Sequence, residues 1–442
     1  MALASQRTQV MRRVVMRHVV HRTCVGWTGH MCSRLGVIAA LTGVLAACSN
    51  DHSSSPFLVR DSAGVTIVES LEPMWEEDEG WWLSDEPAVT IGQDDGREEY
   101  SLFEVRGAVR LPNGRIVVAN GGSDQLRYYD SIGVHLYSVG QDGYGPGEFK
   151  IMRAMWRVGD SLVINDRGQD RITVWTADGE YGRTVMLHRE PGSGAPNAVG
   201  VFFDGSVLGM QFVFDRSAIS EEGMNFVNPD MVLRRYSPDG VLLDSLGVFF
   251  YAELISEMLN RRTDEATGIA YGSSVSSSAP FGREASWSAS GDHVYYGSSQ
   301  RYEILVMSKS GTLERIVRRL IPNEPVTASD IQEFREEFVD EDSRFATWQR
   351  RRVEELKYPD TKPAYGTFTV DALGYIWVAE YDSGEEEGVR DWTVFDPEGT
   401  MLGIARIPSG GRVYEIGEDY VLGKWLTELD VEQVRMYRLH RN

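Results

Sequence analysis

Residues Gly107–Gly140 read GAVRLPNGRIVVANGGSDQLRYYDSIGVHLYSVG, and Ala154–Val185 read AMWRVGDSLVINDRGQDRITVWTADGEYGRTV. The two segments align on their late glycines, Gly133 and Gly179. Each contains four short apolar runs separated by turn residues, such as Pro112-Asn113-Gly114 in the first. A four-stranded unit of roughly 40–50 residues cannot bury its own faces, so its copies pack around a common axis. The repeat therefore predicts an all-β protein of the β-propeller class.

Later copies of the repeat predict six blades in all. The last copy ends without a fourth strand, and Ala88–Asp94 (AVTIGQD) resembles the end of the first copy at Tyr137–Asp142 (YSVGQD). We therefore expect this N-terminal segment to complete the last blade and close the ring. Phe57–Glu69 predicts a further hairpin, either an addition to an edge or part of a seventh blade. The later copies are Gly200–Leu246, Ser286–Leu320, Thr367–Ile407 and Arg412–Leu439.

Two segments interrupt the repeats. Phe249–Pro280 is mixed, with a predicted short helix at Ala252–Leu259 and a serine-rich end. Thr327–Leu356, between the fourth and fifth blades, is predicted to be helical because apolar residues recur at helical spacing from Ile331 to Phe338. This helical insertion either covers part of the propeller or forms an arm that binds a partner.

The N-terminal region predicts export. Arg34 precedes an apolar run, Leu35–Val44, that is too short to span a bilayer but is typical of a signal-peptide core. Leu45-Ala46-Ala47-Cys48 then resembles a bacterial lipobox, whose cysteine becomes the lipidated first residue of the mature protein. The alternative is an ordinary secretory signal with an incidental cysteine. Because the stretch before Arg34 is long and rich in arginine, translation starts either at Met1 or at Met31.

These features divide the chain into a signal peptide at 1–47, a tether at 48–56 and a propeller at 57–442. Loss of the signal peptide removes six arginines and no carboxylate, which takes the formal charge from -22 to -28. A strongly acidic body opposes binding to nucleic acid and to anionic lipid, so we expect membrane contact through the lipid anchor only. Since Cys24 and Cys32 are removed and Cys48 is lipidated, the mature domain has neither a disulfide nor a thiol nucleophile.

Polar side chains recur at the blade positions that face one end of a propeller's channel. The residues before the first strand and after the second strand of each blade lie at the same end of the channel. Arginine is frequent before the first strand, and amide, carboxylate or ammonium groups follow the second. The candidate residues of this channel mouth are Arg106, Arg153, Arg283, Arg412, Asn120, Asp166, Gln211, Glu380 and Lys424.

Two interpretations of this ring stay open. Guanidinium groups match carboxylates and phosphates, so they predict a site for an anionic small ligand or a peptide carboxylate. Alternatively, each arginine pairs with a carboxylate such as Asp166 or Glu380 and holds neighbouring blades in register. We expect no cofactor. A weaker alternative is a divalent cation held by Asn120, Asp166 and Glu380, whose oxygens are suitable ligands.

The segment Gly143–Phe149 (GYGPGEF) and the turn Val174–Gly179 (VWTADG) resemble those of NHL-repeat propellers. From about Gly92 to Leu439 the chain is similar to exported six-bladed propellers that bacteria carry as lipoproteins, distantly related to the TolB-like group. This resemblance implies the fold. It implies no single activity, since such propellers include binding modules, lactonases and lyases.

The sequence therefore predicts a lipid-anchored protein of the cell envelope, at the periplasmic or outer-membrane face. Its expected role is binding, through the channel mouth or the helical insertion, to an unidentified protein, peptide or anionic small ligand. Catalysis is the less favoured interpretation. The alternative function is a metal-dependent lyase or hydrolase, similar to the lactonases, that uses the same channel mouth.

Overall fold

The segment Gly107–Gly140 folds into the sheet that its pattern predicts. Its four antiparallel strands pair in chain order. The last turn is closed by Asp130, whose Oδ1 accepts hydrogen bonds from the backbone N–H groups of Ile132 and Val134, and by Gly133 at a φ of +88°. The strands are β5 (Val105–Arg110), β6 (Ile116–Asn120), β7 (Gln125–Tyr129) and β8 (His135–Val139).

The computed structural model describes residues 55–441, apart from 77–78, 94–95, 192, 214–223, 264–269, 342, 345 and 382–387. These residues belong to the unit Ser54–Asn442. The predicted signal peptide at 1–47, the lipidation site Cys48 and most of the tether at 48–56 lie outside the described residues. Within the described ranges, no helix has the length and apolarity that crossing a bilayer requires.

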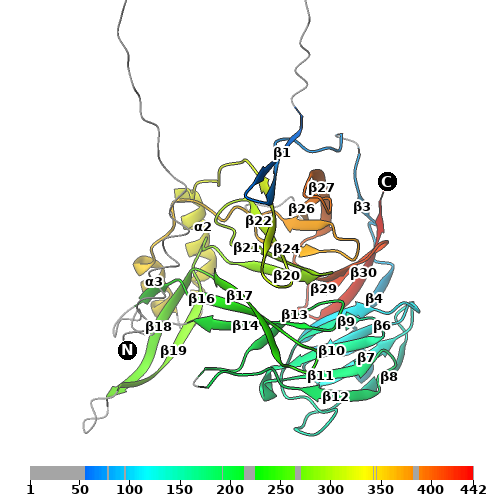
Figure 1. Cartoon of the computed structure of the whole chain (residues 1–442). Helices are drawn as coiled ribbons and strands as arrows, with labels where there is room; N and C mark the ends of the chain where they lie inside the picture. Colours follow the sequence, from blue (N-terminus) through cyan, green and yellow to red (C-terminus); the bar gives the residue numbers. More distant parts are fainter. Residues whose placement is uncertain are drawn as a thin grey trace, which may run out of the picture. The chain divides into compact units, whose positions relative to one another are not determined.

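Five more antiparallel sheets follow along the described chain (Figure 1). The second contains β9 (Met152–Val158), β10 (Ser161–Asp166), β11 (Arg171–Thr176) and β12 (Tyr181–Val185), and the third β13 (Asn197–Val201), β14 (Val207–Val213), β16 (Asp230–Tyr236) and β17 (Leu242–Phe250). The fourth contains β20 (Ser286–Ser290), β21 (His293–Gly297), β22 (Glu303–Ser308) and β23 (Leu313–Arg319). The fifth contains β24 (Thr367–Val370), β25 (Ile376–Ala379), β26 (Val389–Phe395) and β27 (Met401–Pro408), and the sixth β28 (Arg412–Ile416), β29 (Tyr420–Leu426) and β30 (Glu432–His440).

The first strands of these sheets lie against one another in sequence. β5 contacts β9, β9 contacts β13, β13 contacts β20, β20 contacts β24, and β28 contacts β5. The fifth and sixth sheets are joined by the backbone N–H of Ala372, which donates to the carbonyl oxygen of Ile416 at 3.1 Å. The sheets therefore follow one another around an axis, as the blades of a β-propeller do.

The sixth sheet is completed from the N-terminal side, as the sequence predicts. β4 (Val89–Ile91) pairs antiparallel with β30, and β3 (Trp82–Leu83) pairs with the end of the same strand. Ile91 is fully buried against residues of the first and sixth sheets. A strand from near the start of the described chain thus pairs with its last strand, which removes an unpaired edge.

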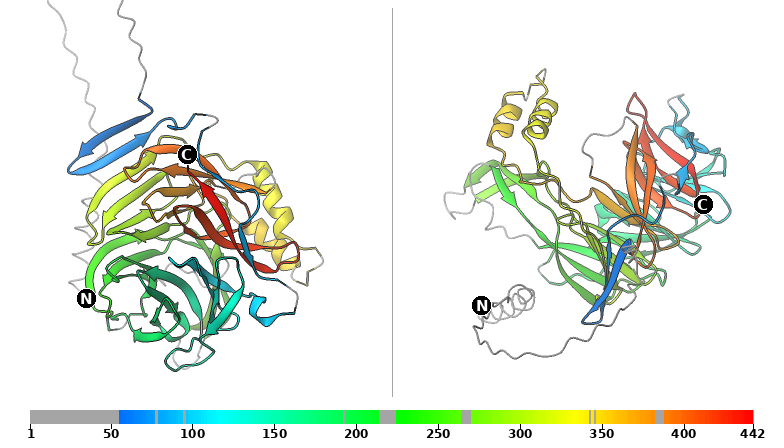
Figure 2. Two further views of the ribbon diagram at one scale, coloured as in Figure 1. Left: turned by 90° about the vertical axis from the view of Figure 1, so that its right-hand side faces the viewer. Right: turned by 90° about the horizontal axis from the view of Figure 1, so that it is seen from above.

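The predicted hairpin at Phe57–Glu69 is an edge addition. β1 (Phe57–Ser62) pairs with β2 (Val65–Ser70), and β2 pairs parallel with β23. The fourth sheet is thereby extended to six strands (Figure 2).

The prediction of a helix at Ala252–Leu259 is wrong. From Leu254 onward this segment lies in β18 (Leu254–Thr263), which pairs with β19 (Ala270–Ser278) and with β15 (Met224–Val227) in a separate three-stranded sheet. The predicted helix does not form because the serine-rich strand beside this segment pairs with it along its length.

Two helices, α2 (Ala328–Phe338) and α3 (Ala346–Glu355), occupy the segment predicted to be helical. α2 begins with a capping box, in which the side chain of Thr327 accepts from the backbone N–H of Asp330. Both helices pack beside β18 and β19 (Figure 2). The apolar residues of this contact are Ile255, Ala279, Phe334, Phe338, Val353 and Leu356.

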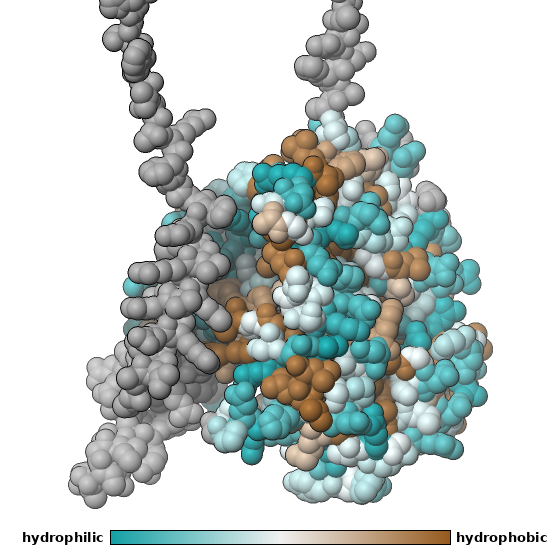
Figure 3. All heavy atoms as spheres, in the orientation of Figure 1, coloured by the Kyte–Doolittle hydropathy of each residue, from teal (hydrophilic) through white to brown (hydrophobic). Residues whose placement is uncertain are grey.

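The apolar core lies between neighbouring sheets. Tyr128 of β7 packs with Trp175 of β11, and Met210 of β14 packs with Tyr296 of β21. On the face drawn in Figure 3, apolar residues form separate patches among hydrophilic ones. Each sheet buries its faces against the neighbouring sheets. The apolar core therefore lies between the sheets, and it does not fill the space around the axis.

Candidate functional site

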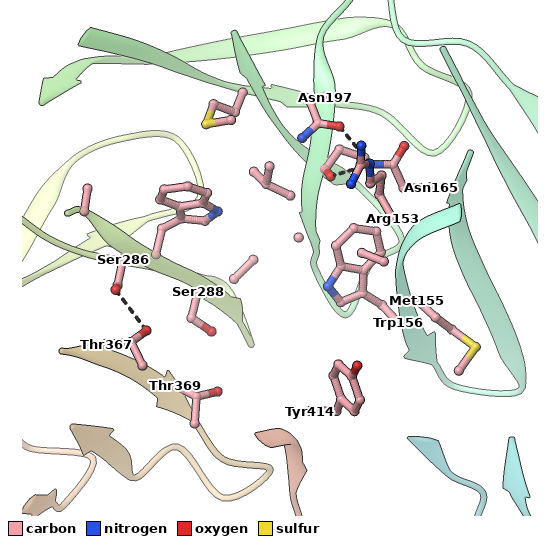
Figure 4. A pocket seen from close by; sticks show the side chains of 18 of the residues that line it. Arg153, Met155, Trp156, Asn165, Asn197, Ser286, Ser288, Thr367, Thr369 and Tyr414 are labelled. Carbon is pink, nitrogen blue, oxygen red and sulfur yellow. Dashed lines mark hydrogen bonds between the residues drawn. The ribbon is translucent and has the colours of Figure 1, made fainter. Parts of the chain in front are cut away.

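A cavity of about 870 Å³ lies where the first strands of the six sheets meet. It is lined by residues of β5, β9, β13, β20, β24 and β28, with contributions from β10 and β14. In Figure 4, labelled side chains from β9, β13, β20, β24 and β28 surround one open space. Arg106, Arg153 and Arg412 lie at the start of their strands, so this cavity opens at the predicted channel mouth.

The charged residues that line the cavity are all cationic. Within the described chain, its lining contains Arg106, Arg153, Arg167 and Arg412 and no aspartate or glutamate. The whole sequence has 66 acidic residues against 44 lysines and arginines. The cavity lining is therefore positively charged, although the chain as a whole is negatively charged.

The four arginines differ in their partners. Arg106 forms an ion pair with Glu104 at 2.6 Å, and Arg167 forms one with Asp170. Arg153 and Arg412 are exposed, and neither forms an ion pair with any described residue. The guanidinium of Arg412 lies 5.7 Å from the centre of the Tyr414 ring. Two cations at the mouth are thus free to bind an anion.

Aromatic side chains form another part of the lining. Trp156 of β9 and Trp287 of β20 are half-buried, so each indole presents a surface to the cavity. Tyr251 lies beside Trp287, with ring centres 6.2 Å apart. Burial, together with the carboxylate of Glu284, raises the pKa of Tyr251. Its phenol is therefore neutral at physiological pH.

Amides and hydroxyls supply the uncharged polar groups. Asn165 is buried, and its Nδ2 donates to Oδ1 of Asn197 at 2.9 Å and to the carbonyl oxygen of Ala198 at 3.0 Å (Figure 4). Ser286 and Thr367 share a hydrogen bond of 3.0 Å between their hydroxyls. The hydroxyls of Ser288 and Thr369 also line the cavity, and neither bonds to a described residue.

Three of the four predicted arginines meet at this cavity, but Arg283 does not line it. Its guanidinium bonds to the carboxylate of Glu253 at 3.3 Å and to the hydroxyl of Thr361 at 2.8 Å. Glu253 follows β17, in the segment where the sequence predicted a helix. The extended backbone there places its carboxylate against Arg283, which holds that arginine away from the cavity.

The predicted polar residues at the ends of the second strands do not line the cavity either. Asn120 accepts a hydrogen bond from the N–H of Phe103 at 2.9 Å. Asp166 is fully buried, and its Oδ1 accepts from the N–H groups of Lys150 and Ile151 at 3.2 and 3.1 Å. Both side chains therefore hold the loop that leads into the first strand of their own sheet.

Gln211, Glu380 and Lys424 are also engaged within the protein. Gln211 donates to the carbonyl oxygen of Gly194 at 2.7 Å, and Lys424 pairs with Glu432 at 2.5 Å. Glu380 accepts from the hydroxyl of Tyr302 at 2.6 Å and pairs with Arg319 at 3.1 Å. Its ion pair joins the fourth and fifth sheets.

Arginines on the third strands of the sheets bond to side chains near the ends of the second strands or to backbone before the first strand, and the sequence did not lead us to predict them. Arg171 of β11 pairs with Asp166, and Arg234 of β16 donates to Gln211 at 2.6 Å. Arg127 of β7 donates to the backbone carbonyl oxygens of Glu98 and Ser101. The signal was the recurrence of arginine on the third strand of successive copies of the repeat.

The alternative cation site does not fit these side chains. Asn120, Asp166 and Glu380 use their oxygens as acceptors for backbone N–H, hydroxyl and guanidinium groups of their own sheets or a neighbouring one. In the part of the chain that the structure describes, no group of three or more His, Cys, Asp or Glu side chains is arranged to hold a metal ion. We therefore derive no metal-dependent step.

Asp124, in the loop after β6, has an unusual environment. Burial, followed by the carboxylates of Asp142 and Asp166, raises the pKa of Asp124 to about 6. Its Oδ1 has no hydrogen-bond partner among the described residues, and its φ is +51°. Asparagine tolerates this backbone conformation and carries no charge.

Asp124→Asn is therefore expected to raise the free energy of unfolding at pH 8 by about 1 kcal/mol, since solvent screens this partly exposed group. The unfolded carboxyl titrates near pH 4. Below about pH 4 the Asp124 carboxyl is neutral in both the folded and the unfolded state, so the variant gains no stability there. Between about pH 4 and 6 the folded state still holds the proton while the unfolded state has lost it, so the unsubstituted protein loses stability as the pH rises. Urea denaturation at pH 3.5 and 8 measures the effect.

Asp170→Asn is the matched control, because Asp170 has a φ of +48° but forms an ion pair with Arg167. It is expected to give no gain at either pH. Equal gains for Asp124→Asn at both pH values would contradict the assignment.

Comparisons with known proteins find likenesses among solved structures only. No protein-family model matches the chain, and no curated protein matches its sequence. An exported-protein candidate of Bacteroides fragilis is 11% identical over 85% of this chain and 99% of its own, with a TM-score of 0.43. A DUF4221 member of Bacteroides vulgatus is 10% identical over 82% and 99%, with a TM-score of 0.41. Virginiamycin B lyase of Staphylococcus aureus is 10% identical over 82% and 100%, with a TM-score of 0.38. At these scores the likenesses carry no argument about function.

Proposed function

We propose that this protein is an extracytoplasmic, lipid-anchored β-propeller of six blades that binds an anionic ligand in its axial cavity. The successive sheets and the pairing of β4 with β30 support the blade count. The lipobox at Cys48 and the resemblance to NHL-repeat and TolB-like lipoproteins support the anchor. A shift of the Cys48→Ser variant from the membrane to the soluble fraction of cells tests that part of the proposal.

The observation that carries the binding function is the pair Arg153 and Arg412. Their guanidinium groups stand in a cavity whose described lining holds no carboxylate, and neither has an ion-pair partner among the described residues. An anion that enters the cavity can accept charge-assisted hydrogen bonds from these unpaired guanidinium groups, which no internal carboxylate already satisfies. The ligand is drawn to this cavity against the acidic charge of the chain as a whole.

The test is calorimetric titration of the purified protein with a panel of small carboxylates, phosphates and sulfates. Each charge-assisted hydrogen bond contributes about 1.5–3 kcal/mol, so Arg153→Gln/Arg412→Gln is expected to weaken binding by at least about 100-fold. Arg189→Gln, an exposed arginine that does not line the cavity, is the control and is expected to bind normally.

Unchanged affinity in the double variant, with the fold intact by circular dichroism, would falsify the proposal. The lactonase-like alternative lacks a supporting observation, because none of its three proposed metal ligands lines the cavity.

A further inference from the structure

The two sides of the axial cavity differ in chemistry, and this difference bears on the class of ligand. Arg412, Arg106 and Arg153 come from the sixth, first and second sheets, which are consecutive around the ring. The fourth and fifth sheets, on the other side, line the cavity with hydroxyls. These are the side chains of Ser286, Ser288, Thr367 and Thr369.

The hydroxyl side has unused hydrogen-bonding capacity. Ser286 and Thr367 bond to each other, but the hydroxyls of Ser288 and Thr369 bond to no described residue. A hydroxyl both donates and accepts, so this wall suits a ligand that itself carries several hydroxyls. On the third sheet, beside Asn165, the carboxamide of Asn197 accepts from Asn165 through its Oδ1, and its Nδ2 has no hydrogen bond to a described residue.

Each side of the cavity also contributes an indole. Trp156 belongs to the second sheet and Trp287 to the fourth, and both are half-buried in the cavity wall. Their flat apolar faces match the C–H face of a sugar ring, which packs on an aromatic ring while its hydroxyls point outward. Tyr251, which also lines the cavity, lies beside Trp287 with the ring centres 6.2 Å apart.

We infer that the ligand is an acidic saccharide, such as a short oligomer of uronic acid. This inference rests on the proposed anion binding and deepens it. Its carboxylate meets Arg153 and Arg412, its rings pack on the indoles, and its hydroxyls bond to Ser288 and Thr369. An inorganic anion uses only the arginines, and a fatty acid leaves the hydroxyl wall unpaired. The cavity, at about 870 Å³, falls within the range of about 300–1,000 Å³ typical of ligand sites.

The experiment compares three probes by calorimetric titration of the purified protein. Trigalacturonate carries both carboxylates and hydroxylated rings, maltotriose has the hydroxylated rings without a carboxylate, and citrate has carboxylates and a single hydroxyl without a ring. Trigalacturonate is expected to bind at least about tenfold more tightly than either of the others.

Two variants separate the contributions of the two sides. Ser288→Ala/Thr369→Val removes the unpaired hydroxyls with little change of shape, and it is expected to weaken trigalacturonate about tenfold while leaving citrate unchanged. Arg153→Gln is expected to weaken both acidic probes. Thr184→Val on the outer strand β12 is the control and changes neither.

The outcomes distinguish the two proposals. If citrate binds as tightly as trigalacturonate and the hydroxyl variant affects neither, the saccharide inference fails and the anion site stands. The saccharide inference also fails if neither acidic probe binds, or if Arg153→Gln changes the binding of neither probe. Whether the proposed anion binding fails as well is then decided separately, by the panel of small anions and by the Arg153→Gln/Arg412→Gln variant. Tighter binding of a nucleotide or an acidic peptide, tested alongside, also overturns the saccharide.

Discussion

Trp377→Ala is expected to lower the free energy of unfolding by about 3–5 kcal/mol, as truncation of a fully buried aromatic side chain does. Trp377 lies on β25 and has no exposed surface. It packs in the cluster that joins the fifth and sixth sheets, beside Trp81, Trp392 and Trp425. Its loss opens a large cavity where two neighbouring sheets contact each other.

A hydrogen bond adds to the cost of this change. Nε1 of Trp377 donates to Oδ2 of Asp371 at 3.0 Å, and that carboxylate is fully buried. Asp371 also pairs with Arg441 at 2.7 Å, and this guanidinium lies 4.3 Å from the centre of the Trp81 ring. Removing the indole therefore takes a donor from a buried charge.

Urea denaturation followed by circular dichroism measures the loss. Trp82→Ala is the matched control, since Trp82 is 51% exposed and its ring stacks on that of His440. We expect the control to cost less than about 1 kcal/mol. Similar losses for both variants would show that the cluster around Trp377 does not stabilise the contact between the sheets.

Gly92→Ala is the second large effect, with an expected loss of about 3 kcal/mol or more. Gly92 directly follows β4 and has a φ of +112°, a conformation that other residues rarely adopt. A Cβ there would lie 2.5 Å from the carbonyl oxygen of Glu432 at the start of β30. Because the obstructing atom belongs to the backbone, β4 and β30 must move apart.

Gly96→Ala separates the two causes. Gly96 has a φ of +80°, but an added Cβ meets nothing within 4 Å, so only the backbone conformation is strained. We expect a loss of about 1 kcal/mol, and thermal denaturation compares the two variants. Equal losses would mean that the approach of Gly92 to β30 does not contribute to closure of the sixth sheet.

Closure of the sixth sheet by β4 helps to position the arginines that line the cavity. Arg412 begins β28 of the sheet that β4 completes, and β28 contacts β5, which carries Arg106. Variants that loosen β4 are therefore expected to weaken ligand binding as well as stability.

Local sequence predicted the elements that local chemistry forms. The turn at Asp130 and Gly133 is closed by side-chain and backbone bonds within five residues of sequence. The alternation of apolar residues predicted the strands, and the similarity of Ala88–Asp94 to the end of the first copy predicted the closing strand. Equivalent positions of a repeat share their environment, so Arg106, Arg153 and Arg412 could be placed at one cavity.

Partners distant in sequence could not be predicted. Arg283 fits the repeat pattern, but Glu253 takes its guanidinium because a strand replaces the expected helix. Asp166 and Glu380 fit a metal site by type, yet other groups already occupy their oxygens. Asp166 pairs with Arg171 of β11 and accepts from backbone N–H groups, and Glu380 pairs with Arg319 at the end of β23. Which polar group is left without a partner depends on all its neighbours in space.

The sequence by itself determined the repeating sheets, the closing strand and the position of the mouth, because each depends on a pattern repeated along the chain. Only the tertiary structure decided which side chains face the cavity unpaired. Among the described residues, Arg153 and Arg412 have no ion-pair partner, and the hydroxyls of Ser288 and Thr369 have no hydrogen bond. Trp156 and Trp287 complete the wall, because packing of the sheets around one axis brings these distant residues to one cavity.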